Sequence, residues 1–196
     1  MPVLVMAIGY LLGSIPFGLI LTKGAGAGDL RAIGSGSIGA TNVLRTGRKG
    51  LAAATLFLDG AKGFAAVLAG AALLPGAGGA LGGVMALVGH CYPVWLRFNG
   101  GKGVASLLGV ALALYWPAVL VFALVWLSMA GLTRISSVGG MSAALAMPAA
   151  AFALGRGDLV MPFAAMAALV LWKHRPNIRR LLNGTESRIG QKSGPA

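Results

Sequence analysis

Residues 51–73 read LAAATLFLDGAKGFAAVLAGAAL, an apolar run long enough to cross a bilayer as a helix. Its only ionisable residues are Asp59 and Lys62. The rest of the chain has the same character, because 57% of the 196 residues are hydrophobic, only 10% are charged, and the mean hydropathy is +0.84. A soluble domain carries about 25% charged residues. The composition therefore indicates a membrane protein.

Seven apolar stretches predict an all-α fold, a polytopic membrane bundle of seven transmembrane helices. The stretches are 3–22, 51–73, 79–96, 103–115, 117–133, 137–154 and 159–173. The fourth and fifth adjoin at Pro117, which favours a turn or kink. Five or six spans also fit the sequence if these two form one helix or one stretch is re-entrant. We expect the first stretch to be retained, because it lacks the basic flank of a cleaved signal peptide.

The distribution of basic residues predicts the orientation. With the N-terminus outside, all Lys and Arg residues except Lys62 and Arg156 fall in inner segments. These segments are 23–50, 97–102, the turn at Arg134, and a tail that begins at Lys173 and includes Lys192. Because Lys and Arg concentrate on the cytoplasmic side, we predict a cytoplasmic C-terminus. The net charge of +12 then suits anionic headgroups or a phosphorylated substrate, and we expect no nucleic-acid partner.

Residues 34–45, GSGSIGATNVLR, imitate a dinucleotide-binding fingerprint. Gly34, Gly36 and Gly39 give G-x-G-x-x-G, and Asp59 follows at the distance of the acid that binds ribose. That motif needs a preceding strand and a surrounding βαβ unit. The preceding GAGAGDLRAI has no strand pattern, and Asp59 lies within an apolar span. The context excludes a nicotinamide site.

The same loop has the chemistry of a phosphate site. Glycine backbone can curl around an anion and present several N–H donors to it. Side-chain donors surround the glycines, namely Ser35, Ser37, Thr41, Asn42 and Arg45. A flexible polar loop, or capping of the next helix by Ser35, Thr41 and Asn42, would also explain these residues.

Two further basic segments share this composition. Residues 89–106, GHCYPVWLRFNGGKGVAS, place Gly100, Gly101, Lys102 and Gly103 directly before an apolar helix, an arrangement suited to phosphate. Residues 174–186, HRPNIRRLLNGTE, contribute His174, Asn177 and Arg180. All three segments fall on the predicted cytoplasmic side, so they predict one anion site. The alternatives are charges that face lipid headgroups, a solvated helix face around Asn177, and packing or capping roles for the histidines.

The motifs together are similar to those of a known family. GSGSIGATNVLRTG, LDGAKG, GHCYPVWLRFNGGKGVAS and HRPNIRRLLNGTE resemble, in order and spacing, the motifs of the bacterial acyl-phosphate:glycerol-3-phosphate acyltransferases. The resemblance runs from GSIPFG at 13–18 to Glu186, nearly the whole chain. Ser37 stands where the family usually has Asn, and Ser106 where Thr is common. Both keep a hydrogen-bonding group.

The resemblance implies an activity. A fatty acyl group would pass from acyl-phosphate to the 1-hydroxyl of glycerol 3-phosphate, giving lysophosphatidic acid and inorganic phosphate. Residues 1–196 would form a single integral membrane domain in the bacterial cytoplasmic (inner) membrane, with its active site on the cytoplasmic side. Its partners would be both substrates, the bilayer and a soluble enzyme that produces acyl-phosphate. No cofactor or metal is expected.

The resemblance also implies roles for individual residues. The catalytic set would be Ser35, Arg45, Lys102, His174 and Asn177. The substrate-binding set would be Gly34, Gly36, Ser37, Gly39, Thr41, Asn42, His90, Gly100, Gly101, Gly103 and Arg180. Glu186 would support the site by bracing it or by neutralising the tail arginines.

Asp59 and Lys62 lie three residues apart on one helix face within an apolar span. An intramembrane ionisable pair can have a function of its own, but we expect a structural ion pair that supports the glycine loops.

The sequence offers no conventional nucleophile. Cys91 adjoins His90, but neighbouring residues on a helix project in different directions. A G-x-S-x-G elbow and an H-x-x-x-x-D motif are both absent from the sequence. We therefore expect direct attack by the glycerol hydroxyl without an acyl-enzyme. A substrate phosphate would accept the proton, with His90 or His174 as the alternative base.

Two rival functions remain open at the level of sequence. A transporter for a phosphorylated solute would also need inner glycine loops and intramembrane ionisable residues. It also predicts polar pathway residues on both sides, however, and the outer turns PGAGG, YWP and GRGD are short. The second rival is the same acyl transfer from acyl-CoA or acyl-carrier protein.

Overall fold

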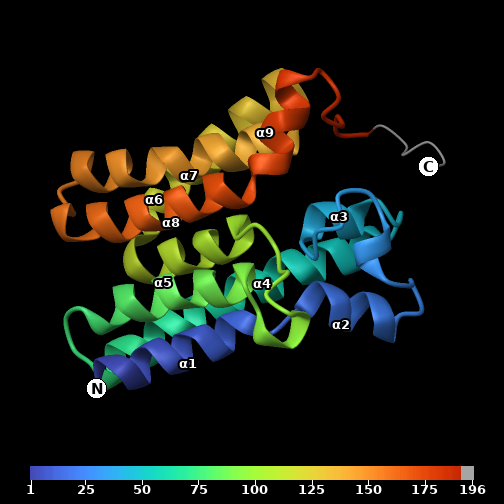
Figure 1. The fold of residues 1–196 in the computed structure, drawn as a ribbon. Coiled ribbons are helices and arrows are strands. Elements are labelled where there is room, and N and C mark those ends of the chain that lie inside the picture. The colour runs from blue at the N-terminus through green and yellow to red at the C-terminus, as the bar shows by residue number, and fades with distance from the viewer. Residues whose placement is uncertain (191–196) are drawn as a thin grey trace. The chain divides into compact units, whose positions relative to one another are not determined.

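The stretch 51–73 forms helix α4, Lys49–Leu73. The computed structural model describes residues 1–190, and every regular element within them is a helix, which confirms the all-α prediction (Figure 1). The longer helices are α1 Pro2–Ser14, α2 Phe17–Gly24, α4, α5 Gly78–Cys91, α6 Val104–Thr133, α7 Ser136–Ala153, α8 Val160–Lys173 and α9 Arg175–Leu182. The short ones are η1 Leu30–Ala32, α3 Ala40–Leu44, η2 Val94–Leu96 and η3 Gly157–Leu159.

Five helical segments in residues 1–190 are long and apolar enough to cross a membrane. They are Pro2–Gly24, Lys49–Leu73, Gly78–Leu96, Val104–Thr133 and Ser136–Ala153. Helix α8 matches the predicted stretch 159–173 but has only 14 residues. The count of seven spans and the orientation stay predictions, and Lys192 lies outside the described residues.

Prolines break two of the long segments. Ile15 is extended, with ψ of 116°, and separates α1 from α2 just before Pro16. This break was not expected within 3–22, although a residue before proline disfavours helical backbone. In α6, Tyr115 leaves the helix with φ −163° and ψ 88°. The kink predicted near Pro117 is therefore present, in the turn where the proline ring would meet the preceding helix.

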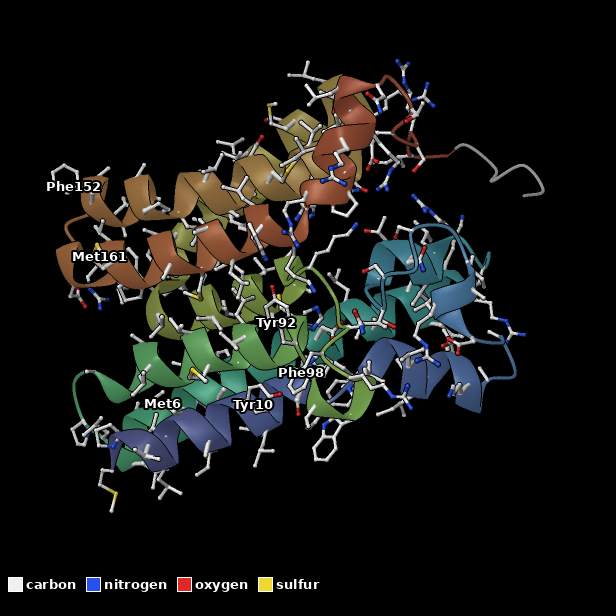
Figure 2. The ribbon with its side chains drawn as sticks, viewed as in Figure 1. Met6, Tyr10, Tyr92, Phe98, Phe152 and Met161 are labelled. Carbon is white, nitrogen blue, oxygen red and sulfur yellow. The ribbon has the colours of Figure 1, made fainter. Side chains whose placement is uncertain are left out.

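The chain divides into two compact units, Met1–Val110 and a second unit that begins at Ala111. In the first unit, α1, α4 and α5 pack against one another (Figure 1). Tyr10 of α1 donates a hydrogen bond of 2.8 Å to the Tyr92 carbonyl, and both are labelled in Figure 2. Gly13 explains how close α1 and α5 come, because a Cβ there would collide with the Ala86 backbone. Small residues at a helix interface let membrane helices approach closely in this way.

In the second unit, α7 packs against α8. Phe152 and Met161 lie near one end of these helices (Figure 2) and are 77% and 75% exposed, as suits side chains that face lipid. Arg156 and Asp158 form an ion pair of 2.7 Å in the turn between them. The Arg156 guanidinium also lies 5.2 Å from the centre of the Tyr115 ring.

Two short helices lie within the polar segments. Helix α3 forms the second half of the segment 34–45, and α9 forms part of the segment 174–186. Neither has the apolar run that reveals a membrane helix, and α3 has only 5 residues. Short helices of this kind depend on tertiary contacts rather than on intrinsic propensity.

The substitution Gly13→Ala should destabilise the first unit. The added methyl would meet the Ala86 backbone, which cannot move without shifting α5. Overpacking of this kind costs about 1–3 kcal/mol. Gly131→Ala is the matched control, because no described atom lies within 4 Å of a Cβ built on that helical glycine. Unfolding of both variants in detergent micelles measures the difference, and equal stabilities would contradict the packing described for α1.

Candidate active site

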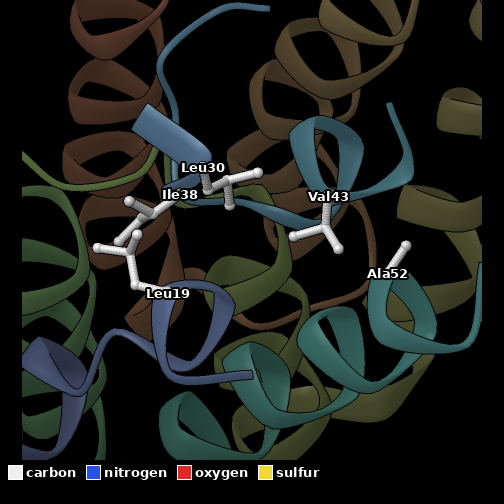
Figure 3. Packing of buried hydrophobic residues seen from close by; sticks show 5 residues of the cluster. All are labelled: Leu19, Leu30, Ile38, Val43 and Ala52. Atoms are coloured by element: carbon white, nitrogen blue, oxygen red, sulfur yellow. The ribbon is translucent and has the colours of Figure 1, made fainter. Parts of the chain in front are cut away.

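The glycine loop, residues 34–45, is anchored by a small apolar core (Figure 3). Ile38 and Val43 of the loop are 2% and 0% exposed. They pack with Leu19 of α2, Leu30 of η1 and Ala52 of α4. This burial fixes a segment whose glycines alone would leave it flexible.

Asn42 organises the loop from inside. Its Nδ2 lies 2.8–2.9 Å from the carbonyl oxygens of Leu30, Ile33 and Ser37, and the Ser35 amide donates to its Oδ1 at 3.2 Å. Asn42 is only 2% exposed. Its amide therefore satisfies loop backbone groups that would otherwise be buried unpaired. The N-cap residue of α3 is Gly39, which has no side chain, so the capping alternative does not describe Asn42.

Arg45 lies against the first glycine of the loop. Gly34 and Gly36 have φ of +54° and +66°, the left-handed region that favours glycine. A Cβ on Gly34 would collide with the Arg45 guanidinium and with Asn42. The loop thus holds a cation directly over a glycine turn.

Several loop amides are already used within the loop. The Gly36 amide donates to the Ile33 carbonyl at 3.0 Å, and the Gly39 amide lies 3.4 Å from Ser37 Oγ. Thr41 is exposed and Ser35 is half-buried. The hydroxyls and Arg45 are therefore better placed than these amides to meet an anion.

The second segment forms a lysine turn, residues 100–103, that leads into α6. The amides of Gly100 and Gly101 donate to the carbonyls of Cys91 and His90 at 3.2 and 3.0 Å, which ties the turn to the end of α5. Gly103, with φ of +87°, accepts the first hydrogen bond of α6. Lys102 stands half-buried at this helix N-terminus. A helix N-terminus with a lysine suits an anion. The phosphate-binding role of this turn stays a prediction.

Behind the lysine turn lies a buried charged cluster. Lys62 Nζ is 2.7 Å from Asp59 Oδ1, and His90 Nδ1 is 3.6 Å from the same oxygen. Lys62 also donates to the Ile15 carbonyl at 2.8 Å. The three side chains are 2–3% exposed.

The second unit contains a polar cluster around Glu186. Its Oε1 accepts hydrogen bonds from Ser137 Oγ at 2.7 Å and Asn177 Nδ2 at 2.5 Å, and its Oε2 accepts one from Arg180 Nε at 2.6 Å. Burial alone would raise the pKa of the Glu186 carboxyl, but donation from Asn177, Ser137 and Arg180 holds that pKa below its ordinary value. Glu186 therefore joins the tail to α7 and α9.

His174, between α8 and α9, and Asn177 of α9 are both buried, each 3% exposed. His174 Nδ1 lies 2.7 Å from the Val170 carbonyl. Because a carbonyl only accepts, Nδ1 carries the hydrogen and the neutral ring has its lone pair on Nε2. Asn177 Oδ1 is buried without a hydrogen-bond partner among residues 1–190. Such an acceptor is unusual and suits a ligand donor.

The structure brings the predicted residues together in two groups. The glycine loop, Asp59, Lys62, His90 and the lysine turn belong to the first unit, and His174, Asn177, Arg180 and Glu186 belong to the second. Sequence reasoning missed two partners, the Ile15 carbonyl and Ser137, since a backbone carbonyl and a lone helical serine carry no motif. Among residues 1–190, no three His, Cys, Asp or Glu side chains gather as a metal site.

Comparison with known proteins agrees with these motifs. The model of the family described as glycerol-3-phosphate acyltransferase matches residues 3–184. The chain belongs to that family. A relative named glycerol-3-phosphate acyltransferase from Rhodopseudomonas palustris is 55% identical over 187 residues, which cover 95% of each chain. One of the same name from Methylorubrum extorquens is 56% identical over 194 residues, covering 97% of this chain and 95% of the relative.

Two solved structures share the fold of this family. Both are crystal structures of PlsY (YgiH), described as an integral membrane glycerol 3-phosphate acyltransferase. Its glycerol 3-phosphate form has a TM-score of 0.90 at 36% identity and covers 96% of both chains. Its lysophosphatidic acid form has a TM-score of 0.87 at 34% identity and covers 96% of this chain and 95% of that one. The protein is thus a multi-pass membrane member of the family.

The substitution Glu186→Gln should destabilise the second unit in a pH-dependent way. A glutamine keeps one acceptor oxygen, so mainly the hydrogen bond from Arg180 to the other oxygen is lost. One hydrogen bond to a charged group contributes about 1.5–3 kcal/mol, so we expect a loss of about 2 kcal/mol near neutral pH. Because the folded-state pKa is lowered, this contribution is fully present above the ordinary pKa and is lost as pH falls through the lowered value.

The unfolding free energies of wild type and variant should therefore converge as the pH falls from about 6 through the lowered pKa of Glu186. Asp158→Asn is the control, since the Asp158 side chain is 61% exposed and its ion pair is screened by water. A difference for Glu186→Gln that stays constant across this range would show that its charge does not hold the cluster.

Proposed function

We propose that the protein transfers a fatty acyl group from acyl-phosphate to the 1-hydroxyl of glycerol 3-phosphate, releasing lysophosphatidic acid and inorganic phosphate. The observation that carries the proposal is the Arg45 guanidinium held over the left-handed turn at Gly34, in a member of the glycerol-3-phosphate acyltransferase family. The solved forms of PlsY with glycerol 3-phosphate and lysophosphatidic acid support the acceptor and the product.

The proposal includes a single catalytic domain of seven spans in the bacterial cytoplasmic membrane, with the N-terminus outside. The helices supply one segment for each predicted stretch when α6 is counted as two segments across its kink at Tyr115. The concentration of Lys and Arg in the intervening segments supports a cytoplasmic site. A soluble enzyme that makes acyl-phosphate could then deliver its product from the same side.

Phosphate recognition is assigned to cations and hydroxyls of two segments of the first unit, the glycine loop 34–45 and the lysine turn 100–103. These two segments are called the two walls. Arg45 and Lys102 would bind phosphate oxygens, since guanidinium and ammonium groups form charge-assisted hydrogen bonds with them. Ser35, Ser37 and Thr41 would add hydroxyl donors, and Asn42 would act by shaping the loop. In the second unit, Asn177 Oδ1 is a buried acceptor that a glycerol hydroxyl can satisfy. In this proposal His174 keeps its expected catalytic role and Arg180 its expected role as a substrate ligand.

The reaction would proceed by direct attack. The 1-hydroxyl oxygen bonds to the acyl carbon while the bond from that carbon to the phosphate oxygen breaks, and the hydroxyl proton leaves on a substrate phosphate. Phosphate is a suitable acceptor because its second pKa lies near about 6. Lys102 and Arg45 would stabilise the charge that develops on the departing phosphate. Cys91, the single cysteine, is 0% exposed and is not placed to form an acyl-enzyme.

The donor assignment is tested with purified protein in detergent and glycerol 3-phosphate. We expect lysophosphatidic acid and phosphate from acyl-phosphate, and initial-rate lines that intersect when both substrates are varied. Release with acyl-CoA or acyl-carrier protein alone would transfer the proposal to those donors. Parallel lines or a trapped acyl-enzyme would contradict direct attack, and uptake of glycerol 3-phosphate into vesicles without reaction would favour transport.

The substitutions Arg45→Ala and Lys102→Ala should each lower kcat strongly. Loss of one charge-stabilising donor costs about 100- to 1,000-fold in kcat. Lys49→Ala is the matched control, because Lys49 is an exposed cation at the start of α4. Full activity in a folded Arg45 or Lys102 variant would refute the assignment of that residue.

A further inference from the structure

The cluster of Asp59, Lys62 and His90 places ionisable groups in a buried apolar environment, where charged groups are unfavourable. Asp59 and Lys62 are each 2% exposed inside α4, a helix apolar enough to span the membrane. Removing an ion from water costs on the order of several kcal/mol, and a buried pair is often no more stabilising than two apolar side chains. Stability alone is therefore a weak reason for the pair, and an intramembrane ionisable residue points to function.

Lys62 connects the cluster to the glycine loop. Its ammonium donates to the Ile15 carbonyl at 2.8 Å, at the break between α1 and α2. Two residues into α2, Gly18 lies so close to the Ile38 carbonyl of the glycine loop that a Cβ there would collide with it. The position of Lys62 thus affects the position of the break at Ile15. Through the break it affects Gly18, which lies against the glycine loop at Ile38.

His90 connects the same cluster to the lysine turn. Its ring fills the space where a Cβ on Gly101 would lie, so ring and backbone are in direct contact. Its own carbonyl accepts the Gly101 amide at 3.0 Å. The ring nitrogen Nδ1 lies 3.6 Å from Asp59 Oδ1, close enough for electrostatic attraction although beyond a normal hydrogen bond. His90 therefore supports the lysine turn from behind.

We propose that Asp59 is a positioning residue whose carboxylate fixes the glycine loop and the lysine turn relative to each other. One oxygen, Oδ1, faces both Lys62 and His90, so a single buried charge acts on both walls within the first unit. The inference rests on the proposed function, because it treats both walls as phosphate-binding. The inference adds an explanation for the distance between the two walls. The Asp59 carboxylate contacts neither wall directly and acts through Lys62 and His90.

The test replaces the pair by apolar residues of similar size, Asp59→Leu with Lys62→Met. Such a replacement of a buried pair is often neutral for stability, so we expect a folded protein with a melting temperature near that of wild type. A shift of a binding group by about 1 Å can cost about 100-fold in rate. We therefore expect a ~100-fold fall in kcat/KM for glycerol 3-phosphate and weaker affinity by calorimetry.

A second variant and a control separate positioning from stability. Asp59→Asn with Lys62→Gln removes both charges but keeps polar side chains, and it should show the same losses. Arg156→Met with Asp158→Leu removes an ion pair of the same 2.7 Å length from the turn of the second unit and should keep full affinity. Failure of both cluster variants to fold, with the control folded, would assign the pair to stability and overturn its positioning role.

The affinity measurement also distinguishes this inference from the proposed donor. Unchanged affinity and unchanged kcat/KM in a folded cluster variant would overturn the positioning role. A wild type that binds glycerol 3-phosphate but releases no phosphate from acyl-phosphate would overturn only the donor assignment, because weaker binding by the variants would still support the inference. A wild type that fails to bind glycerol 3-phosphate would overturn both.

Discussion

The buried ion pair between Asp59 and Lys62 is the constraint around which the glycine loop and the lysine turn are arranged. Two charges inside an apolar helix must be paired with each other and with further polar groups, because water is not available to solvate them. The groups that supply this are the Ile15 carbonyl and the His90 ring. Both belong to the backbone or ends of neighbouring helices, so satisfying the charges also determines how α1, α4 and α5 meet.

The second unit also contains a buried charge that is surrounded by hydrogen-bond partners. Glu186 is a carboxylate with only 5% of its side chain exposed, and three donors surround it, one from α7 and two from α9. The tail after α9 is also joined to the start of α7 by the amide of Ile189, which donates to the Arg134 carbonyl at 2.6 Å. The buried carboxylate of Glu186 thus helps to order a basic segment whose arginines repel one another.

The sequence located the long apolar helices but not the partners of their polar side chains. Apolar runs of about 20 residues identify membrane helices without tertiary information. Pro117 correctly predicted the kink in α6. The break at Ile15 was missed because an apolar run hides it. The residue types expected in a phosphate site led to the prediction that Asn42 binds substrate. In the structure the Asn42 amide contacts loop carbonyls. Which carbonyls need a partner depends on tertiary packing and cannot be read from the sequence. The pairing of Ser137 with Glu186 spans 49 residues and has no local signature.

The central claim is that the glycine loop and the lysine turn are the phosphate-binding walls. It is tested most directly by amide spectra of protein labelled with 15N-glycine in detergent, titrated with glycerol 3-phosphate. The account predicts that the signals of Gly34, Gly36, Gly39, Gly100, Gly101 and Gly103 shift together with one affinity, while those of Gly131 and Gly155 stay in place. Shifts confined to glycines outside these two segments would contradict it.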